Sequence, residues 1–363
     1  MMLAVGLSAL LVLLLAWANG ANGVAKGVAT LSGSGASSAK RAIVWGSVCT
    51  VLGGFAAVWW GASLLRTFGS DFVAPGFHLD LIFVISVLIG ACAWVLSASW
   101  FGFPVSTTHA LLGGIVGAVL IVAGPDGLRT AVVANKAVLP LLVGPFLAVG
   151  LCAAILLLAR YVASKVPAWQ PGCCEPEEWK KNPYVCAQDD APALRRVLRV
   201  QLWTTMHWLS SGTTSFARGL NDTPKIAAFL VLTVAFVPEA NIMHALPTVW
   251  LILAVSLVMG LGGLWGGYKV LNTLAYRVAA IDPRTGLIAN TGTSLLVLAA
   301  TPLGLPVSTT HISTGALMGV RWVDHSRPRE KDALKLILVG WLITVPATGT
   351  VSAAVSLTLH ALE

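Results

Sequence analysis

The hexapeptide Pro-Val-Ser-Thr-Thr-His occurs twice in the chain, at residues 104–109 and again at residues 306–311. A proline followed by Ser or Thr is typical of a helix start, where hydroxyl groups cap backbone N–H groups that lack an intrahelical partner. Such a helix end carries about half a positive charge and presents its N–H groups to anions. The two copies therefore predict an anion site, although these hydroxyls could instead only cap helices or pack. Its hydroxyl ligands would be Ser106, Thr107, Thr108, Ser308, Thr309 and Thr310.

A second pair of segments, residues 20–26 and 219–225, carries Gly, Asn and Lys in register. In the first segment, glycine and asparagine follow an apolar run, and this predicts that the helix ends there and can unwind. Unwound backbone and the amide side chains of Asn19 and Asn22 would then offer oxygen atoms to a coupling cation. The equivalent asparagine of the second segment is Asn221.

Asp222 is the one acidic residue, of 15 in the chain, that falls deep within an apolar segment. An ionisable group at such a depth is costly, so its presence points to function. The sequence predicts a coupling role for Asp222, with a structural pair to Arg218 or Lys225 as the alternative. Lys26 and Lys225 also fall deep. Three roles stay open for these lysines: holding the anion, neutralising Asp222, or extending to a membrane interface.

Histidines and cysteines add weaker signals. His109 and His311 end the two hexapeptides and could shuttle protons, although a buried, hydrogen-bonded histidine is the more common arrangement. Three of the six cysteines lie in one polar segment and could bind a metal, but they have neither a fixed spacing nor a neighbouring histidine. The sequence therefore predicts no metal site beyond Na+ and no cofactor. The three cysteines are Cys173, Cys174 and Cys186.

The amino-acid composition indicates which class of fold positions these residues. Of the 363 residues, 56% are hydrophobic and 10% are charged, whereas a soluble domain carries about 25% charged residues. The mean hydropathy is +0.82, and many apolar runs approach the length that crosses a membrane as a helix. We therefore predict an all-α integral membrane protein with about ten spans or membrane-inserted segments. They lie near 2–18, 42–65, 79–100, 110–123, 137–160, 208–236, 246–267, 286–300, 312–323 and 334–359.

The hexapeptides predict broken helices at the membrane midplane. The runs that follow them, 110–123 and 312–323, are too short to span, because a helix of 14 residues rises about 21 Å. The first run, 2–18, resembles a signal peptide, but no Lys or Arg precedes Lys26, so we interpret it as a retained span.

The repeated motifs divide the chain into two similar halves. We predict a first repeat at 1–163, a linker loop at 164–199 and a second repeat at 200–363. Five apolar runs in each half is an odd number, so the second half must enter the membrane from the opposite side. The halves are therefore predicted to be inverted-topology repeats.

The distribution of basic residues predicts the orientation. With the N-terminus outside, 17 of the 23 Lys and Arg residues fall on the inner side, and only Arg66, Arg129 and Lys136 fall on the outer side. Both termini should be outside and the central loop cytoplasmic, in a multi-pass protein of the plasma (inner) membrane. This bias also explains the formal charge of +8 without nucleic acid, because no basic block with interleaved aromatic residues occurs.

At these motifs the chain resembles the PiT family of inorganic phosphate transporters. The resemblance rests on residues 19–30 and 216–225 together with both hexapeptides, and it covers nearly the whole chain outside 164–199. It implies a phosphate permease coupled to Na+ or H+ and built of two inverted halves. By the same resemblance, the hexapeptide hydroxyls bind the anion. It also implies that Asn22, Asn221 and Asp222 belong to the ion and anion site.

One departure from the family pattern concerns the coupling ion. The family carries an aspartate after the asparagine of the first element, and this chain has Gly23 there. One carboxylate for a cation is therefore missing, while Lys26 and Lys225 bring positive charge close to that position. We accordingly assign Asn19, Asn22, Asn221 and Asp222 to the coupling ion. We add Asn22, Asn221, Lys26 and Lys225 to the anion ligands.

Several functions compete. The leading expectation is a symporter of inorganic phosphate coupled to Na+ or H+. A permease for sulfate or another tetrahedral oxyanion of the same family is the first alternative, and an anion channel is the second. An enzyme is not expected, because no nucleophile–base pair or metal-ligand cluster stands out. The expected partners are the anion and membrane lipid, with a homodimer as a possible assembly.

The orientation can be tested by cysteine labelling. An impermeant thiol reagent added to intact cells should leave Cys173, Cys174 and Cys186 unmodified, because the central loop is predicted to be cytoplasmic. Labelling after the membrane is permeabilised is the control. Strong labelling from outside would reverse the predicted orientation.

Overall fold

The computed structural model describes residues 1–77, 79–165, 193–237, 247–278, 281–324 and 331–362. Most of the predicted linker, including Cys173, Cys174 and Cys186, lies outside the described residues.

The described residues form helices joined by turns and short non-helical segments, with one isolated β-bridge between Val73 and Leu128. The first half contains α1 (Met2–Gly33), α2 (Ala39–Trp60), α3 (Ala62–Arg66), η1 (Thr67–Asp71), α4 (Leu81–Trp100), α5 (Thr107–Ala123), η2 (Pro125–Gly127), α6 (Thr130–Val132), η3 (Val133–Val138) and α7 (Leu139–Lys165). The second half contains α9 (Ala193–Ala235), α10 (Thr248–Gly266), α11 (Tyr268–Asn272), η6 (Thr273–Val278), α12 (Pro283–Ala300), α13 (Thr309–Asp324) and α14 (Lys331–His360).

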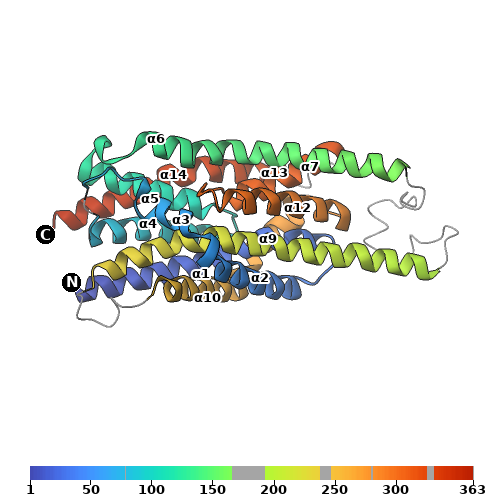
Figure 1. The fold of residues 1–363 in the computed structure, drawn as a ribbon, viewed down its shortest axis with the longest axis horizontal. Coiled ribbons are helices and arrows are strands. Elements are labelled where there is room, and N and C mark those ends of the chain that lie inside the picture. Colours follow the sequence, from blue (N-terminus) through green and yellow to red (C-terminus); the bar gives the residue numbers. More distant parts are fainter. Residues whose placement is uncertain (78, 166–192, 238–246, 279–280, 325–330, 363) are drawn as a thin grey trace.

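The helices lie side by side along the long axis of the molecule (Figure 1). The N-terminus and the C-terminus lie at the same end, while α7 ends and α9 begins at the opposite end. Within the described residues, six helices are long and apolar enough to cross a membrane, and α5 is apolar but shorter. The chain is therefore an all-helical, multi-pass membrane protein, whereas the count of about ten inserted segments stays a prediction.

The helices of the two halves pack in a reciprocal manner. Helix α1 packs on α10 and α9 packs on α2, while α5 packs on α14 and α13 packs on α7. Helices α1 and α9 also contact each other and run antiparallel. Near one end the Ser8 and Thr233 hydroxyls lie 2.6 Å apart, and further along the Ser211 hydroxyl donates to the carbonyl of Gly27 at 2.7 Å.

Glycine allows the long helices to approach closely. A Cβ atom at Gly20 in α1 would overlap the carbonyl oxygen of Met259 in α10. A Cβ atom at Gly219 in α9 would overlap the carbonyl oxygen of Thr50 in α2. Small residues at helix crossings let backbones meet, which is how helices associate where the hydrophobic effect cannot drive them together. The two reciprocal crossings therefore depend on these two glycines.

Two helices end immediately before the hexapeptides. Gly102 and Gly304 adopt φ of 75° and 68°, which L side chains rarely adopt. After each glycine the next amide bonds back to the helix, from Phe103 to the carbonyl of Ala98 at 2.8 Å and from Leu305 to that of Ala300 at 3.2 Å. This is the hydrogen bond that closes a Schellman helix end. The backbone breaks predicted from the two hexapeptides therefore occur, between α4 and α5 and between α12 and α13.

The predicted break at residues 19–23 is wrong. Helix α1 continues without interruption from Met2 to Gly33, and α9 likewise continues past Asn221 although it contains Pro224. Local propensity favoured a helix end at the glycines, but packing overrides it. The small side chains fit tight helix crossings, and the asparagine side chains bond to neighbouring helices instead of to their own backbone.

Substitution of the crossing glycines tests this packing. We expect Gly20→Ala and Gly219→Ala each to destabilise the protein by about 1–3 kcal/mol, because a methyl group must displace a backbone carbonyl. Thermal unfolding in detergent measures the effect as a lowered Tm. Gly6→Ala in the same helix α1 is the matched control, since a Cβ atom there meets no atom within 4 Å. Equal Tm values for all three variants would contradict the assigned crossings.

Candidate functional site

Four charged side chains are buried together at the centre of the fold. Lys26 comes from α1, and Arg218, Asp222 and Lys225 come from α9. Their exposed fractions are 5%, 1%, 5% and 1%, and they are the only buried Asp, Glu, Lys or Arg side chains among those whose side-chain positions the structure describes. Because buried charges are costly unless they are paired and hydrogen-bonded, this group identifies the candidate site.

Lys225 joins the carboxylate to the hexapeptides. Its ammonium group lies 3.3 Å from Asp222 Oδ1, one helical turn earlier in α9, and it also donates to Asn221 Oδ1. It donates further to the Thr108 hydroxyl at 2.8 Å and to the carbonyl of Val307 at 3.1 Å. One lysine therefore contacts both copies of the repeated motif.

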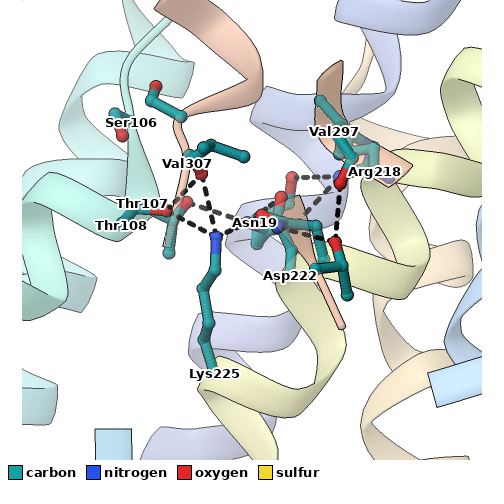
Figure 2. A network of polar contacts seen from close by, with 12 residues as sticks. Asn19, Ser106, Thr107, Thr108, Arg218, Asp222, Lys225, Val297 and Val307 are labelled. Atoms are coloured by element: carbon teal, nitrogen blue, oxygen red, sulfur yellow. Dashed lines mark hydrogen bonds and ion pairs between the residues drawn. The ribbon is translucent and has the colours of Figure 1, made fainter. Parts of the chain in front are cut away.

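Asn19 connects the carboxylate to the arginine. Its amide nitrogen donates to Asp222 Oδ2 at 3.3 Å and to the Thr107 hydroxyl at 2.8 Å. Its Oδ1 accepts from Arg218 Nη1 at 2.9 Å, and Arg218 Nη2 donates to the Thr50 hydroxyl at 2.9 Å. Figure 2 shows Asn19 and Asp222 between Lys225 on one side and Arg218 on the other. Asn19 thus links the Asp222 carboxylate to the Arg218 guanidinium group through hydrogen bonds.

Asn22 and Asn221 tether the interrupted segments. Asn22 donates to the carbonyl of Phe103 at 2.8 Å and accepts from the backbone N–H of Val105 at 3.0 Å. Asn221 donates to the Thr301 hydroxyl at 3.0 Å. Both side chains therefore hold the segments that lead into α5 and α13, and they do so from helices that are continuous.

The two interrupted segments cross and bond to each other. The Thr310 hydroxyl donates to the carbonyl of Val105 at 2.9 Å, and the Thr108 hydroxyl donates to the carbonyl of Val307 at 3.3 Å. Lys26 also donates to the carbonyl of Val105, at 2.8 Å. Each valine carbonyl therefore accepts from the threonine of the opposite half and from the lysine of its own half. This places the N-termini of α5 and α13 beside the charged group.

The serines of the hexapeptides cap helices. Ser106 Oγ accepts from the backbone N–H of His109 at 3.2 Å, and Ser308 Oγ accepts from that of His311 at 3.3 Å. The two histidine rings are buried against each other with centroids 4.4 Å apart. Thr309 begins α13 and is 5% exposed. The structure thus places Thr107 and Thr108 in contact with Asn19 and Lys225, and Thr310 on the carbonyl that Lys26 also bonds. The two serines cap their helices.

A small cavity adjoins Lys26. It is lined by that lysine and by polar side chains of α1, α12 and α13, among them Thr30, Asn290, Thr293 and Thr314. Thr30 lies one helical turn beyond Lys26 on α1, in the direction of the end where α9 begins, because His207 of α9 bonds to Thr30 at 3.1 Å. The cavity therefore extends from the centre toward that end of the bundle.

The sequence alone did not assign Arg218 to the site. From the sequence, Arg218 was expected only as a structural partner of Asp222. The available signal was spacing, since Arg218 precedes Asp222 by four residues and so lies on the same face of a helix. The carbonyls of Val105 and Val307 were also missed, because a backbone acceptor leaves no mark in side-chain identity.

The fold and the site together define a polytopic membrane transport protein with a buried, positively charged centre. Residues 19–352 match the phosphate transporter family, and the chain belongs to that family. The family is one of transporters and not of enzymes.

Curated relatives align along most of the chain. A protein of Mycobacterium leprae (strain TN), named a probable low-affinity inorganic phosphate transporter, is 25% identical over 352 residues, covering 94% of this chain and 75% of that protein. A protein of Rhizobium meliloti (strain 1021) with the same name is 25% identical over 335 residues, covering 92% and 90%. A solved structure of a sodium-dependent phosphate transporter covers 100% of both chains at a TM-score of 0.80 and 24% identity, which shows a shared fold.

The hydroxyl contacts generate a test of the site. We expect Thr107→Ala, Thr108→Ala, Thr309→Ala and Thr310→Ala to weaken anion binding. A hydrogen bond to a charged group contributes about 1.5–3 kcal/mol, so affinity should fall by about tenfold to a hundredfold. Titration of the purified protein with labelled phosphate measures this loss.

Two further variants control for folding. Thr108→Ser keeps the hydroxyl that contacts Lys225 and should retain most of the affinity. Thr213→Ala removes an exposed hydroxyl on α9 and should have no effect. Wild-type affinity in all four alanine variants would leave these threonines with a packing role only.

Proposed function

We propose that this protein is a secondary active transporter of inorganic phosphate, coupled to Na+ or H+, in the plasma membrane. One observation carries the proposal. Three buried cations, Lys26, Arg218 and Lys225, surround one carboxylate, Asp222, beside two helix N-termini. Such a centre has more positive than negative charge, so an anion is the ligand that balances it.

Tetrahedral anions fit the donors of the centre. The hydroxyls of the two hexapeptides and the lysine ammonium groups are hydrogen-bond donors, and the first turns of α5 and α13 add backbone N–H groups. In the described state these donors bond to one another and to the valine carbonyls, and an entering anion would replace those contacts. Family membership and the names of the relatives support phosphate as that anion.

Two inverted repeats are the architecture that we assign to this function. The reciprocal helix contacts support this, as do the reciprocal bonds of Thr108 to Val307 and of Thr310 to Val105. In transporters built this way, one repeat rocks against the other around a site at their interface. The crossing of the two interrupted segments is such an interface.

The small cavity beside Lys26 supports an inward route from the site. It extends toward the end of the bundle where α7 ends and α9 begins, and the basic residues of the sequence assign that end to the cytoplasm. In this orientation both termini are outside. Thr30, Asn290 and Thr293 give this route a polar lining.

Two other functions use the same donors. Sulfate is also a tetrahedral anion, so a sulfate permease is the first alternative. Sulfate carries no proton at neutral pH, whereas phosphate carries at least one and can donate a hydrogen bond to Asp222 or to a valine carbonyl; these acceptors favour phosphate. An anion channel is the second alternative, and it cannot accumulate its substrate against a gradient.

Uptake into proteoliposomes tests the proposal. We expect labelled phosphate to accumulate above equilibrium, with saturation, when a sodium or a proton gradient is imposed separately. Asp222→Asn should abolish accumulation and leave exchange of internal for external anion, because coupling needs the carboxylate while the cations remain. The measured quantities are the accumulation ratio and the exchange rate.

Asp126→Asn is the matched control, because Asp126 is exposed in η2 and should leave accumulation unchanged. Preference for sulfate would select the sulfate permease, and equilibration without accumulation would select the channel. If Asp222→Asn concentrates phosphate as well as wild type does, the coupling role of Asp222 is wrong.

A further inference from the structure

Arg218 occupies the space above Gly23. A Cβ atom built at Gly23 would overlap Nη1 of Arg218 and would lie 2.9 Å from its Cζ. The guanidinium group therefore fills the volume that any side chain at position 23 would need. This is the position at which the sequence resemblance led us to expect a carboxylate.

The guanidinium group also takes up the oxygen atoms around that position. Nη1 donates to Asn19 Oδ1 at 2.9 Å and lies 3.4 Å from the Asn19 carbonyl oxygen, and Nη2 donates to the Thr50 hydroxyl at 2.9 Å. Amide, carbonyl and hydroxyl oxygens are the ligands that a hard cation such as Na+ requires. In this chain they accept hydrogen bonds from a fixed cation instead.

Arg218 keeps one donor that the protein does not satisfy. Its Nε is buried, and no acceptor among the described residues lies within hydrogen-bond reach. A buried N–H group without a partner is costly, so it needs an acceptor such as an ordered water or a bound ligand. The unpaired Nε–H group and the positive charge of Arg218 both favour an anion as that ligand.

Charge balance leads to the same conclusion. The buried centre holds three positive side chains (Lys26, Arg218 and Lys225) and one negative side chain (Asp222), an excess of two positive charges. A divalent oxyanion neutralises this excess. A sodium ion bound in addition would restore an uncompensated buried charge, which is unfavourable.

We propose that Arg218 is a built-in replacement for a coupling sodium ion, so that a divalent oxyanion binds and crosses without sodium. The inference rests on the proposed function, because it concerns the same anion site. It assigns a role to Arg218 and limits the coupling ion of that transporter to one other than sodium.

Sodium binding measures this directly. We expect purified wild-type protein to show no saturable binding of ²²Na⁺, with or without inorganic phosphate. Phosphate uptake into proteoliposomes should be equal in sodium and choline media, whereas a sodium-coupled site would change phosphate affinity by about 5- to 150-fold. Saturable ²²Na⁺ binding by the wild type overturns the inference.

Paired substitutions make the test sharper. The double variant Gly23→Asp with Arg218→Ala removes the fixed cation and adds a carboxylate in the space that it leaves, and it should gain saturable ²²Na⁺ binding. Arg218→Lys keeps a positive charge and should bind no sodium. Arg66→Ala removes an exposed arginine and should also bind none. A double variant that unfolds at the wild-type Tm but gains no sodium binding contradicts the replacement.

The two proposals fail in different ways. Phosphate uptake that requires sodium overturns the inference about Arg218 and leaves the phosphate transporter intact. Proteoliposomes that accumulate neither phosphate nor sulfate overturn the proposed function. The ²²Na⁺ measurement on the purified wild type still decides the inference in that case, because it needs no transport.

Discussion

The carbonyl groups of Val105 and Val307 impose the constraint on which the centre depends. Both lie in non-helical segments within a bundle of apolar helices, where water is scarce and an unpaired carbonyl is costly. Each is satisfied by a threonine of the opposite half and a lysine of its own half. The lysines in turn are buried cations that need a counter-charge. The helix interruptions therefore leave two carbonyls that the buried lysines satisfy. The lysines require an anionic partner, which is Asp222 or, under the proposed function, the substrate.

Rigid helices make this arrangement possible. Helices α1 and α9 run unbroken past the site, fixed to α10 and α2 at Gly20 and Gly219, and they carry all four buried charges. The interrupted segments bring hydroxyls and helix N-termini to these fixed charges. Under the proposed function, a movement of the interrupted segments against α1 and α9 would shift the hydroxyls relative to the buried cations. Alternating access needs this property of a substrate site.

Much of this could be predicted from the sequence, because repetition is visible there. The identical hexapeptides predicted the breaks, and the shared Asn and Lys of residues 20–26 and 219–225 predicted a second set of site residues. The continuity of α1 could not be predicted, because glycine favours a helix end locally and only contact with Met259 shows that it serves packing. The position of Arg218 over Gly23 was equally hidden, since it depends on how two antiparallel helices align. Asp222 and Lys225, by contrast, were conspicuous as charges within an apolar segment.

The alignment of α1 with α9 also explains why the two halves differ where they do. With Asn22 matched to Asn221, Asn19 corresponds to Arg218 and Gly23 corresponds to Asp222. Asn19 bonds to Asp222, and Arg218 lies over Gly23. The same two matched positions therefore contact each other twice, once with each half supplying each position. In one meeting a short side chain faces a carboxylate, and in the other a long side chain faces a glycine. The two contacts thus divide their side-chain volume differently. The Asn19–Asp222 contact contains a negative group, and the Arg218–Gly23 contact contains a positive one. Two matching pairs of positions thus hold a carboxylate in one case and a guanidinium group in the other, so the centre has a negative side and a positive side.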